Sequence, residues 1–133
     1  MREDKADNHL ISLTDREQKI TAHLVSLQVS PDAITYLTIA PSRLGDADEA
    51  AKTILKLIVS ENLKSILLLT REFESKRILK VYQKNLSSLP VQISCFPFPS
   101  EMTASNWFLS DDGFREVAYE YIRYLYYFIR GII

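Results

Sequence analysis

The chain has 133 residues, 47% of them hydrophobic, and a formal net charge of -1 at pH 7. This length and composition predict one folded domain over residues 1–133 and argue against a disordered chain. It also argues against nucleic acid as a partner, because that binding needs a basic surface, and against a membrane span, since no stretch reaches the roughly 18 apolar residues required.

The first predicted helix follows a polar segment, residues 1–12. Thr14 and Glu17 have the spacing of a capping box, and apolar residues then recur at helical intervals. The pattern predicts a helix over about 14–28. The β-branched run 34–39, which lies between two prolines, predicts a strand.

Helices and strands alternate in the middle of the chain. Asp46 is predicted to cap a helix over about 47–62, which carries one apolar stripe. The unbroken apolar run 65–70 indicates a strand that is buried on both faces, as in the centre of a parallel sheet. A charged helix over about 71–86 and an alternating strand over 91–96 follow.

The last predicted helix spans about 113–130, after a loop that contains Trp107. Helical spacing places Glu120 on its polar side and the following apolar residues on its packed side: Val117, Tyr121, Tyr124, Leu125 and Phe128. The polar side mixes Arg and Glu rather than forming a Lys/Arg cluster. We therefore expect the helix to pack on the sheet rather than to lie on a membrane surface.

Strands separated by helices predict an α/β fold, with a short parallel sheet and helices on both faces. Three strands are fewer than the ~4–6 of common sheets. We expect a missing N-terminal segment, a partner or a second copy of the chain to complete the sheet, because an open edge is prone to pairing.

Ligands of open α/β sheets bind beyond the carboxyl ends of the strands. The first loop there leads to Asp46 and Glu49, which either orient a ligand hydroxyl or metal or simply cap a helix. The second begins at Thr70, which is predicted to cap the following helix and create an anion site with Arg77. The alternative is a surface ion pair between Arg77 and Glu74.

The third loop contains Trp107, which either stacks on a planar ligand or serves packing. Glu120 is a further candidate, with a solvated or ion-paired carboxylate as the alternative. The sequence has no glycine-rich phosphate loop and no Gly-x-Ser-x-Gly motif. His9 and His23 lack partners at zinc-ligand spacing, and Cys95 is expected to be a small buried residue.

These regions resemble the YdcF/ElyC/SanA family over about residues 14–130. The family has a Thr-x-x-Glu-Ala-like helix start, a Thr-Ser-x-x-His-x-x-Arg-like turn, a Trp loop and a Glu-x-x-Lys-like motif, in that order. Their counterparts here are DADEA at 46–50, TREFESKR at 70–77, Trp107 and EYIR at 120–123. The family's Ser and His positions hold Arg71 and Glu74, and its N-terminal strand and Gly-rich loop have no counterpart.

The resemblance implies a Rossmann-like, three-layer domain of which the chain is the C-terminal portion. It implies a nucleotide-like or anionic ligand, with S-adenosylmethionine as a candidate, and leaves catalysis open. It also implies a bacterial protein linked to envelope biogenesis, either cytoplasmic or associated with the membrane through another segment. The implied ligand-binding residues are Asp46, Glu49, Thr70, Arg71, Glu74, Arg77, Trp107 and Glu120.

The alternative function is that of a structural or interaction module without a small-molecule site. Such a module would complete its sheet with a partner or with a second copy of the chain. The loss of the family's first strand and the acidic Glu74 in place of a histidine favour this alternative.

Overall fold

The computed structural model of the chain describes residues 4–41, 46–98 and 101–133, with side chains described from residue 15 onward. The chain falls into two compact units, one that ends at Thr38 and one that begins at Ile39. The first unit consists of helix α1 (Asp4–Ser26), the short 3-10 turn η1 (Pro31–Ala33) and an extended segment after it.

Helix α1 begins well before Thr14, so the predicted capping box lies inside the helix and that prediction is wrong. The preceding sequence contains no Gly or Pro that would stop a helix. The predicted strand at 34–39 is also wrong, because this segment is extended but has no hydrogen-bonded neighbour among the described residues. Instead, the Tyr36 hydroxyl lies 2.8 Å from the Thr21 hydroxyl and donates to the Glu17 carbonyl at 2.9 Å.

The second unit is built on a parallel sheet whose described strands are β1 (Ser65–Arg71) and β2 (Gln92–Phe98). Ser65 lies opposite Gln92, and the register continues to the last residue of each strand. Helix α3 (Ser75–Asn85) connects the two strands, so the prediction of a mixed α/β fold with a parallel sheet is confirmed. Strand β2 continues through Pro97, which an edge strand tolerates.

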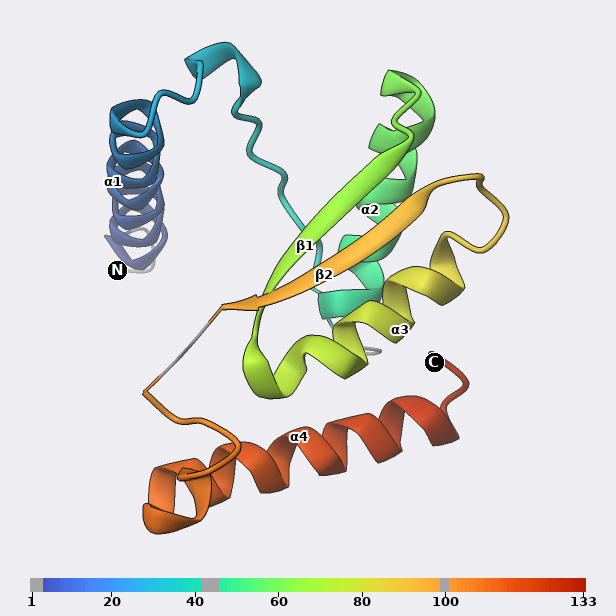
Figure 1. Ribbon diagram of the computed structural model, residues 1–133. Coiled ribbons are helices and arrows are strands. Elements are labelled where there is room, and N and C mark those ends of the chain that lie inside the picture. Colours follow the sequence, from blue (N-terminus) through green and yellow to red (C-terminus); the bar gives the residue numbers. More distant parts are fainter. Residues whose placement is uncertain (1–3, 42–45, 99–100) are drawn as a thin grey trace. The chain divides into compact units, whose positions relative to one another are not determined.

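Helices cover one face of this sheet. Ile66, Leu68 and Ile93 pack against helix α2 (Asp46–Glu61) and helix α3, and Figure 1 shows these helices beside the sheet. On the other face, Leu67 and Leu69 are 63% and 67% exposed. The prediction that β1 is buried on both faces, with helices on both sides of the sheet, is therefore wrong for the described residues.

The core lies between α2, α3 and the end of helix α4 (Asp111–Ile129), which runs along α3 (Figure 1). Each large apolar side chain that is buried there contributes about 1.5–3 kcal/mol. Among the described residues, no helix is both long and apolar enough to cross a membrane. The buried members of the core are Ala51, Ile58, Val81, Tyr82, Leu86, Tyr127 and Ile132.

Helix α4 turns only part of its predicted packed side toward the core, since Val117 is buried there. Glu120 and Tyr127 are buried, whereas Tyr121 and Leu125 are 73% and 57% exposed. The cause is the partner of the helix: α4 contacts the turn that precedes α3, and Glu120 forms an ion pair with Arg77 of α3. A buried arginine needs a carboxylate partner, and Glu120 supplies it from the side of α4 that faces α3.

Candidate functional site

The polar centre of the second unit is a buried ion pair between α3 and α4. The Arg77 Nε donates to Glu120 Oε2 at 2.8 Å, and its Nη2 donates to Glu120 Oε1 at 3.1 Å. Both side chains are 7% exposed, and the guanidinium carbon lies 5.2 Å from the centroid of the Tyr127 ring. Two parallel hydrogen bonds give this pair strength and a fixed geometry, so Arg77 joins the two helices.

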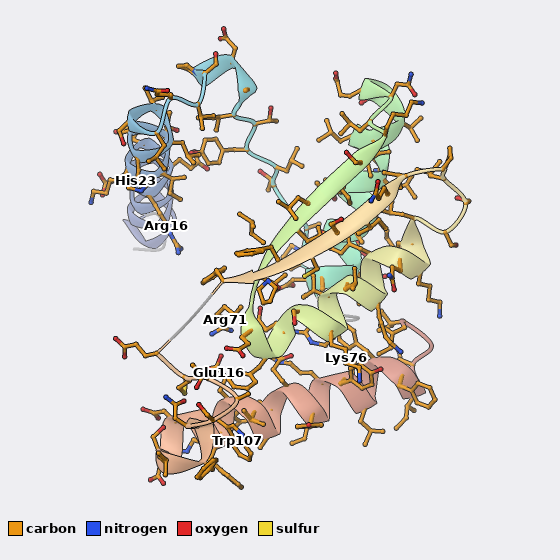
Figure 2. The ribbon with its side chains drawn as sticks, in the orientation of Figure 1. Arg16, His23, Arg71, Lys76, Trp107 and Glu116 are labelled. Atoms are coloured by element: carbon orange, nitrogen blue, oxygen red, sulfur yellow. The ribbon has the colours of Figure 1, made fainter. Side chains whose placement is uncertain are left out.

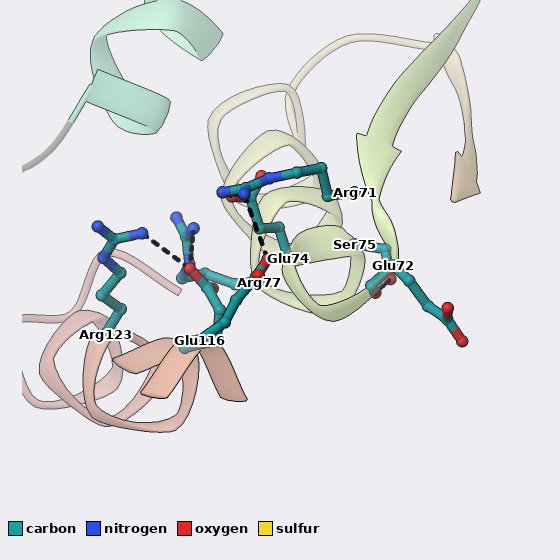
Figure 3. A network of polar contacts seen from close by, with 8 residues as sticks. Arg71, Glu72, Glu74, Ser75, Arg77, Glu116 and Arg123 are labelled. Atoms are coloured by element: carbon teal, nitrogen blue, oxygen red, sulfur yellow. Dashed lines mark hydrogen bonds and ion pairs between the residues drawn. The ribbon is translucent and has the colours of Figure 1, made fainter. Parts of the chain in front are cut away.

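Further ion pairs extend from this centre, as Figure 3 shows. The Arg123 Nη1 lies 2.9 Å from Glu120 Oε1. Arg71, the last residue of β1, donates from Nε to Glu74 at 3.1 Å, and its Nη1 lies 3.2 Å from Glu116 of α4. The hydrogen bond with Glu74 raises the pKa of Arg71. Arg71 therefore ties the end of β1 to the turn before α3 and to α4.

The predicted surface pair between Glu74 and Arg77 is wrong, because each residue has another partner. Residues 72–74 form the 3-10 turn η2 (Glu72–Glu74), and α3 begins only at Ser75. Glu74 therefore lies in the turn before the helix and pairs with Arg71. Arg77 lies in the first turn of α3 and faces α4.

The prediction that Thr70 caps α3 is wrong. It is buried within β1, and its hydroxyl lies 3.4 Å from the sulfur of Cys95 on β2, which is half-buried. The residue that flanks the start of α3 is Glu74, and it forms no side-chain cap. The Ser75 hydroxyl donates to the Glu72 carbonyl at 2.8 Å, so this hydrogen bond spans the turn η2.

The first predicted site, at the start of α2, contains mainly structural contacts. Asp46 is the first helical residue rather than the cap, and Glu49 pairs with Lys52 at 3.0 Å. Asp48, which sequence reasoning missed, is buried, accepts from Asn85 of α3 at 2.9 Å and pairs with Lys52 at 2.7 Å. Burial opposes its ionisation, but the hydrogen bonds from Lys52 and Asn85 outweigh it and lower the pKa of Asp48.

Trp107 belongs to an aromatic cluster at the start of α4. It lies in the 3-10 turn η3 (Trp107–Leu109), with its ring stacked 6.1 Å from Phe114 and edge-on to Phe108 at 5.8 Å. Figure 2 shows Trp107 beside this end of the helix, with Arg71 and Glu116 close to one another. These contacts correspond to the packing alternative for Trp107.

A groove with a volume of about 180 Å³ lies between α3 and α4. The ammonium groups of Lys76 and Lys80 each lie 5.6 Å from the centroid of the Tyr124 ring, and the hydrogen bond with Lys80 lowers the pKa of Tyr124. Within the described ranges, no cluster of His, Cys, Asp and Glu is arranged to hold a metal ion. The groove is lined by Phe73, Lys76, Arg77, Val117, Glu120, Tyr121 and Tyr124.

The structure places four of the eight predicted site residues in two neighbouring sets of ion pairs, one with Arg71 and Glu74 and one with Arg77 and Glu120. Glu116 belongs to the first set and Arg123 to the second, and neither was predicted, although both lie one turn from Glu120. Comparisons of the chain with models of known families, with curated proteins and with solved structures gave no match.

Proposed function

We propose that the chain is an interaction module that packs the open face of its sheet against the same face of a second copy. The observation that carries this proposal is the row of exposed apolar side chains on β1 and β2. Parallel sheets are normally covered on both faces, and contiguous exposed apolar patches mark interaction sites. The row consists of Leu67, Leu69, Phe96 and Phe98.

A second copy suits this face because the face is nearly free of charge. Leu67 lies opposite Ser94 and Leu69 opposite Phe96, and only Arg71 at the end of β1 is charged. Two such faces therefore meet without like-charge repulsion. At roughly 100 Å² for each of the four side chains, the contact would bury about 800 Å² in total, at the weak end of specific interfaces. A reversible dimer is expected.

The sheet-face dimer predicts that a paired substitution weakens self-association. Leu69 and Phe96 are cross-strand neighbours, so Leu69→Ser with Phe96→Ser removes the centre of the apolar row. We expect the dimer dissociation constant, measured by analytical ultracentrifugation over a concentration series, to rise at least tenfold, because two apolar side chains lose their buried contacts.

The matched control is Val59→Ser, which changes an exposed apolar residue of α2. This variant should leave the dissociation constant unchanged. A wild-type chain that stays monomeric at the highest concentrations would contradict the proposal. A monomer in which another segment covers the sheet face would also contradict it. Hydrogen exchange of the strand amides would detect such a cover.

The second candidate function is a Rossmann-like, YdcF-type domain that binds a nucleotide-like or anionic molecule. The observation that favours it is the groove beside Lys76, which offers a cation, an aromatic wall and space. Arg77 is less suited to hold the ligand, because its donors already serve Glu120. S-adenosylmethionine and a link to bacterial envelope biogenesis rest on the resemblance alone.

This second function predicts a rise in melting temperature when the chain is heated with S-adenosylmethionine, a nucleotide or a prenyl phosphate. Ligand at about 100 times its dissociation constant stabilises the fold by about 2.7 kcal/mol. The suitable control is Lys76→Ala, an exposed groove residue, because Arg77→Ala would destabilise the fold itself. A cooperative melt that none of these ligands shifts would exclude them as ligands.

A further inference from the structure

Helix α4 carries a second apolar stripe on the side that faces away from α3. Its members recur at intervals of three, four and seven residues, so they fall on one side of the helix. All are more than half exposed. The stripe extends for about 22 Å along the helix axis, at 1.5 Å per residue. It consists of Phe114, Tyr121, Ile122, Leu125, Phe128 and Ile129.

Basic residues border this stripe on both sides. On one side, α3 presents the exposed lysines 76, 80 and 84 at intervals of four residues. Lys76 and Tyr121 line the same groove, which places the lysine row along that edge, and Figure 2 shows Lys76 where α3 runs beside α4. On the other side, Arg115, Arg123 and Arg130 are exposed, and helical spacing places them beyond Ile122 and Ile129.

The acidic residues of α4 balance these charges only in part, because the exposed Asp111 and Asp112 lie in its first turn, ahead of the stripe. Glu116 pairs with Arg71, and the buried Glu120 pairs with Arg77 and Arg123. Helices α3 and α4, with Arg130 at the end, hold seven basic and four acidic side chains, although the whole chain has a net charge of -1. The exposed surface around the stripe is therefore basic, because α3 supplies the lysines that the polar side of α4 itself lacks.

We infer that this face of α4 docks on the surface of an anionic lipid bilayer. An interfacial helix places its apolar side among the acyl chains and its Lys and Arg side chains at the phosphates. Tyrosines such as Tyr119 and Tyr126, which are exposed along the Arg edge, suit the headgroup level. A second copy fits this face poorly, because two such helices would bring their basic rows together. An anionic bilayer has the complementary charge.

The test is co-sedimentation of the full chain with two kinds of vesicle. One contains equal amounts of phosphatidylglycerol and phosphatidylcholine, and the other contains phosphatidylcholine alone. We expect binding to the anionic vesicles that weakens as salt is added, because salt screens the basic rows. Trp107 is the only tryptophan and lies at the start of α4, so its fluorescence should shift to the blue on binding.

Two kinds of variant separate the apolar and the charged contributions. Leu125→Ser should weaken vesicle binding about tenfold, because it removes a side chain from the acyl region. Lys76→Gln and Lys80→Gln should each weaken it about fivefold. Val59→Ser on α2 is the apolar control, and the Leu69→Ser, Phe96→Ser chain should bind vesicles like the wild type, which separates this surface from the sheet face.

Three results would overturn the inference. The first is the absence of wild-type binding to anionic vesicles at low salt. The second is equal binding to both kinds of vesicle. The third is binding that Leu125→Ser and the lysine variants leave unchanged while circular dichroism shows them folded. These substitutions are at exposed positions, where changes usually alter stability little, so the variants are expected to fold.

Discussion

Replacing Arg77 with alanine is expected to lower the free energy of unfolding by about 3–5 kcal/mol. The substitution removes both hydrogen bonds to Glu120 and leaves that carboxylate 7% exposed in the core. Arg123 still contacts one carboxylate oxygen, but its own side chain is largely in solvent. Because small domains are stable by only about 5–15 kcal/mol, urea unfolding should show a large fall in the midpoint.

The matched control is Arg71→Ala, which also removes an arginine from ion pairs with two glutamates. Half of the Arg71 side chain is exposed, and we expect a loss of less than about 1 kcal/mol, as for other surface pairs. A chain with Arg77→Met and Glu120→Leu should regain much of the lost stability, because no buried charge is left unpaired. Equal losses for Arg71→Ala and Arg77→Ala would refute the structural role of the buried pair.

Arg71 and Arg77 illustrate which structural features local sequence patterns can predict and which they cannot. The pattern predicted α2, α3, α4 and both strands of the sheet, because each shows helical spacing, strand alternation or an unbroken apolar run. It also marked Arg77 as a residue of interest, and the family resemblance added Arg71. The partner of Arg77 lies 43 positions away, and no spacing rule connects residues at that separation. Arg77 was therefore predicted either to bind an anion or to pair with a local residue, Glu74.

Two further predictions were wrong for the same reason, because tertiary contacts determine the structure at these places. Helix α4 has two apolar stripes at helical spacing, one through Val117 and Tyr124 and one through Tyr121 and Leu125. Periodicity does not show which of the two stripes faces the core. The ion pair between Glu120 and Arg77 determines it. The run 34–39 has strand propensity, but a strand needs a hydrogen-bonded neighbour, and the described structure provides none for it.

Replacing Gly113 with alanine is expected to lower the free energy of unfolding by about 2 kcal/mol. Gly113 lies in the first turn of α4, buried beneath η3. A methyl group there would overlap the backbone carbonyl oxygen of Trp107 and would lie 2.9 Å from the Ser110 hydroxyl and 3.0 Å from the Met102 sulfur. The carbonyl can move only if the turn moves, which costs about 3 kcal/mol, while the better helix propensity of alanine returns about 1 kcal/mol.

The substitution should also change the fluorescence of Trp107, because the displaced turn carries that ring and its stack with Phe114. Arg115→Ala, an exposed change in the same turn, should alter the free energy of unfolding by no more than about 0.5 kcal/mol and leave the emission unchanged. A Gly113→Ala chain as stable as the wild type, with the same emission, would mean that η3 is free to move. In that case, the position of Trp107 would not depend on close packing of the turn against α4.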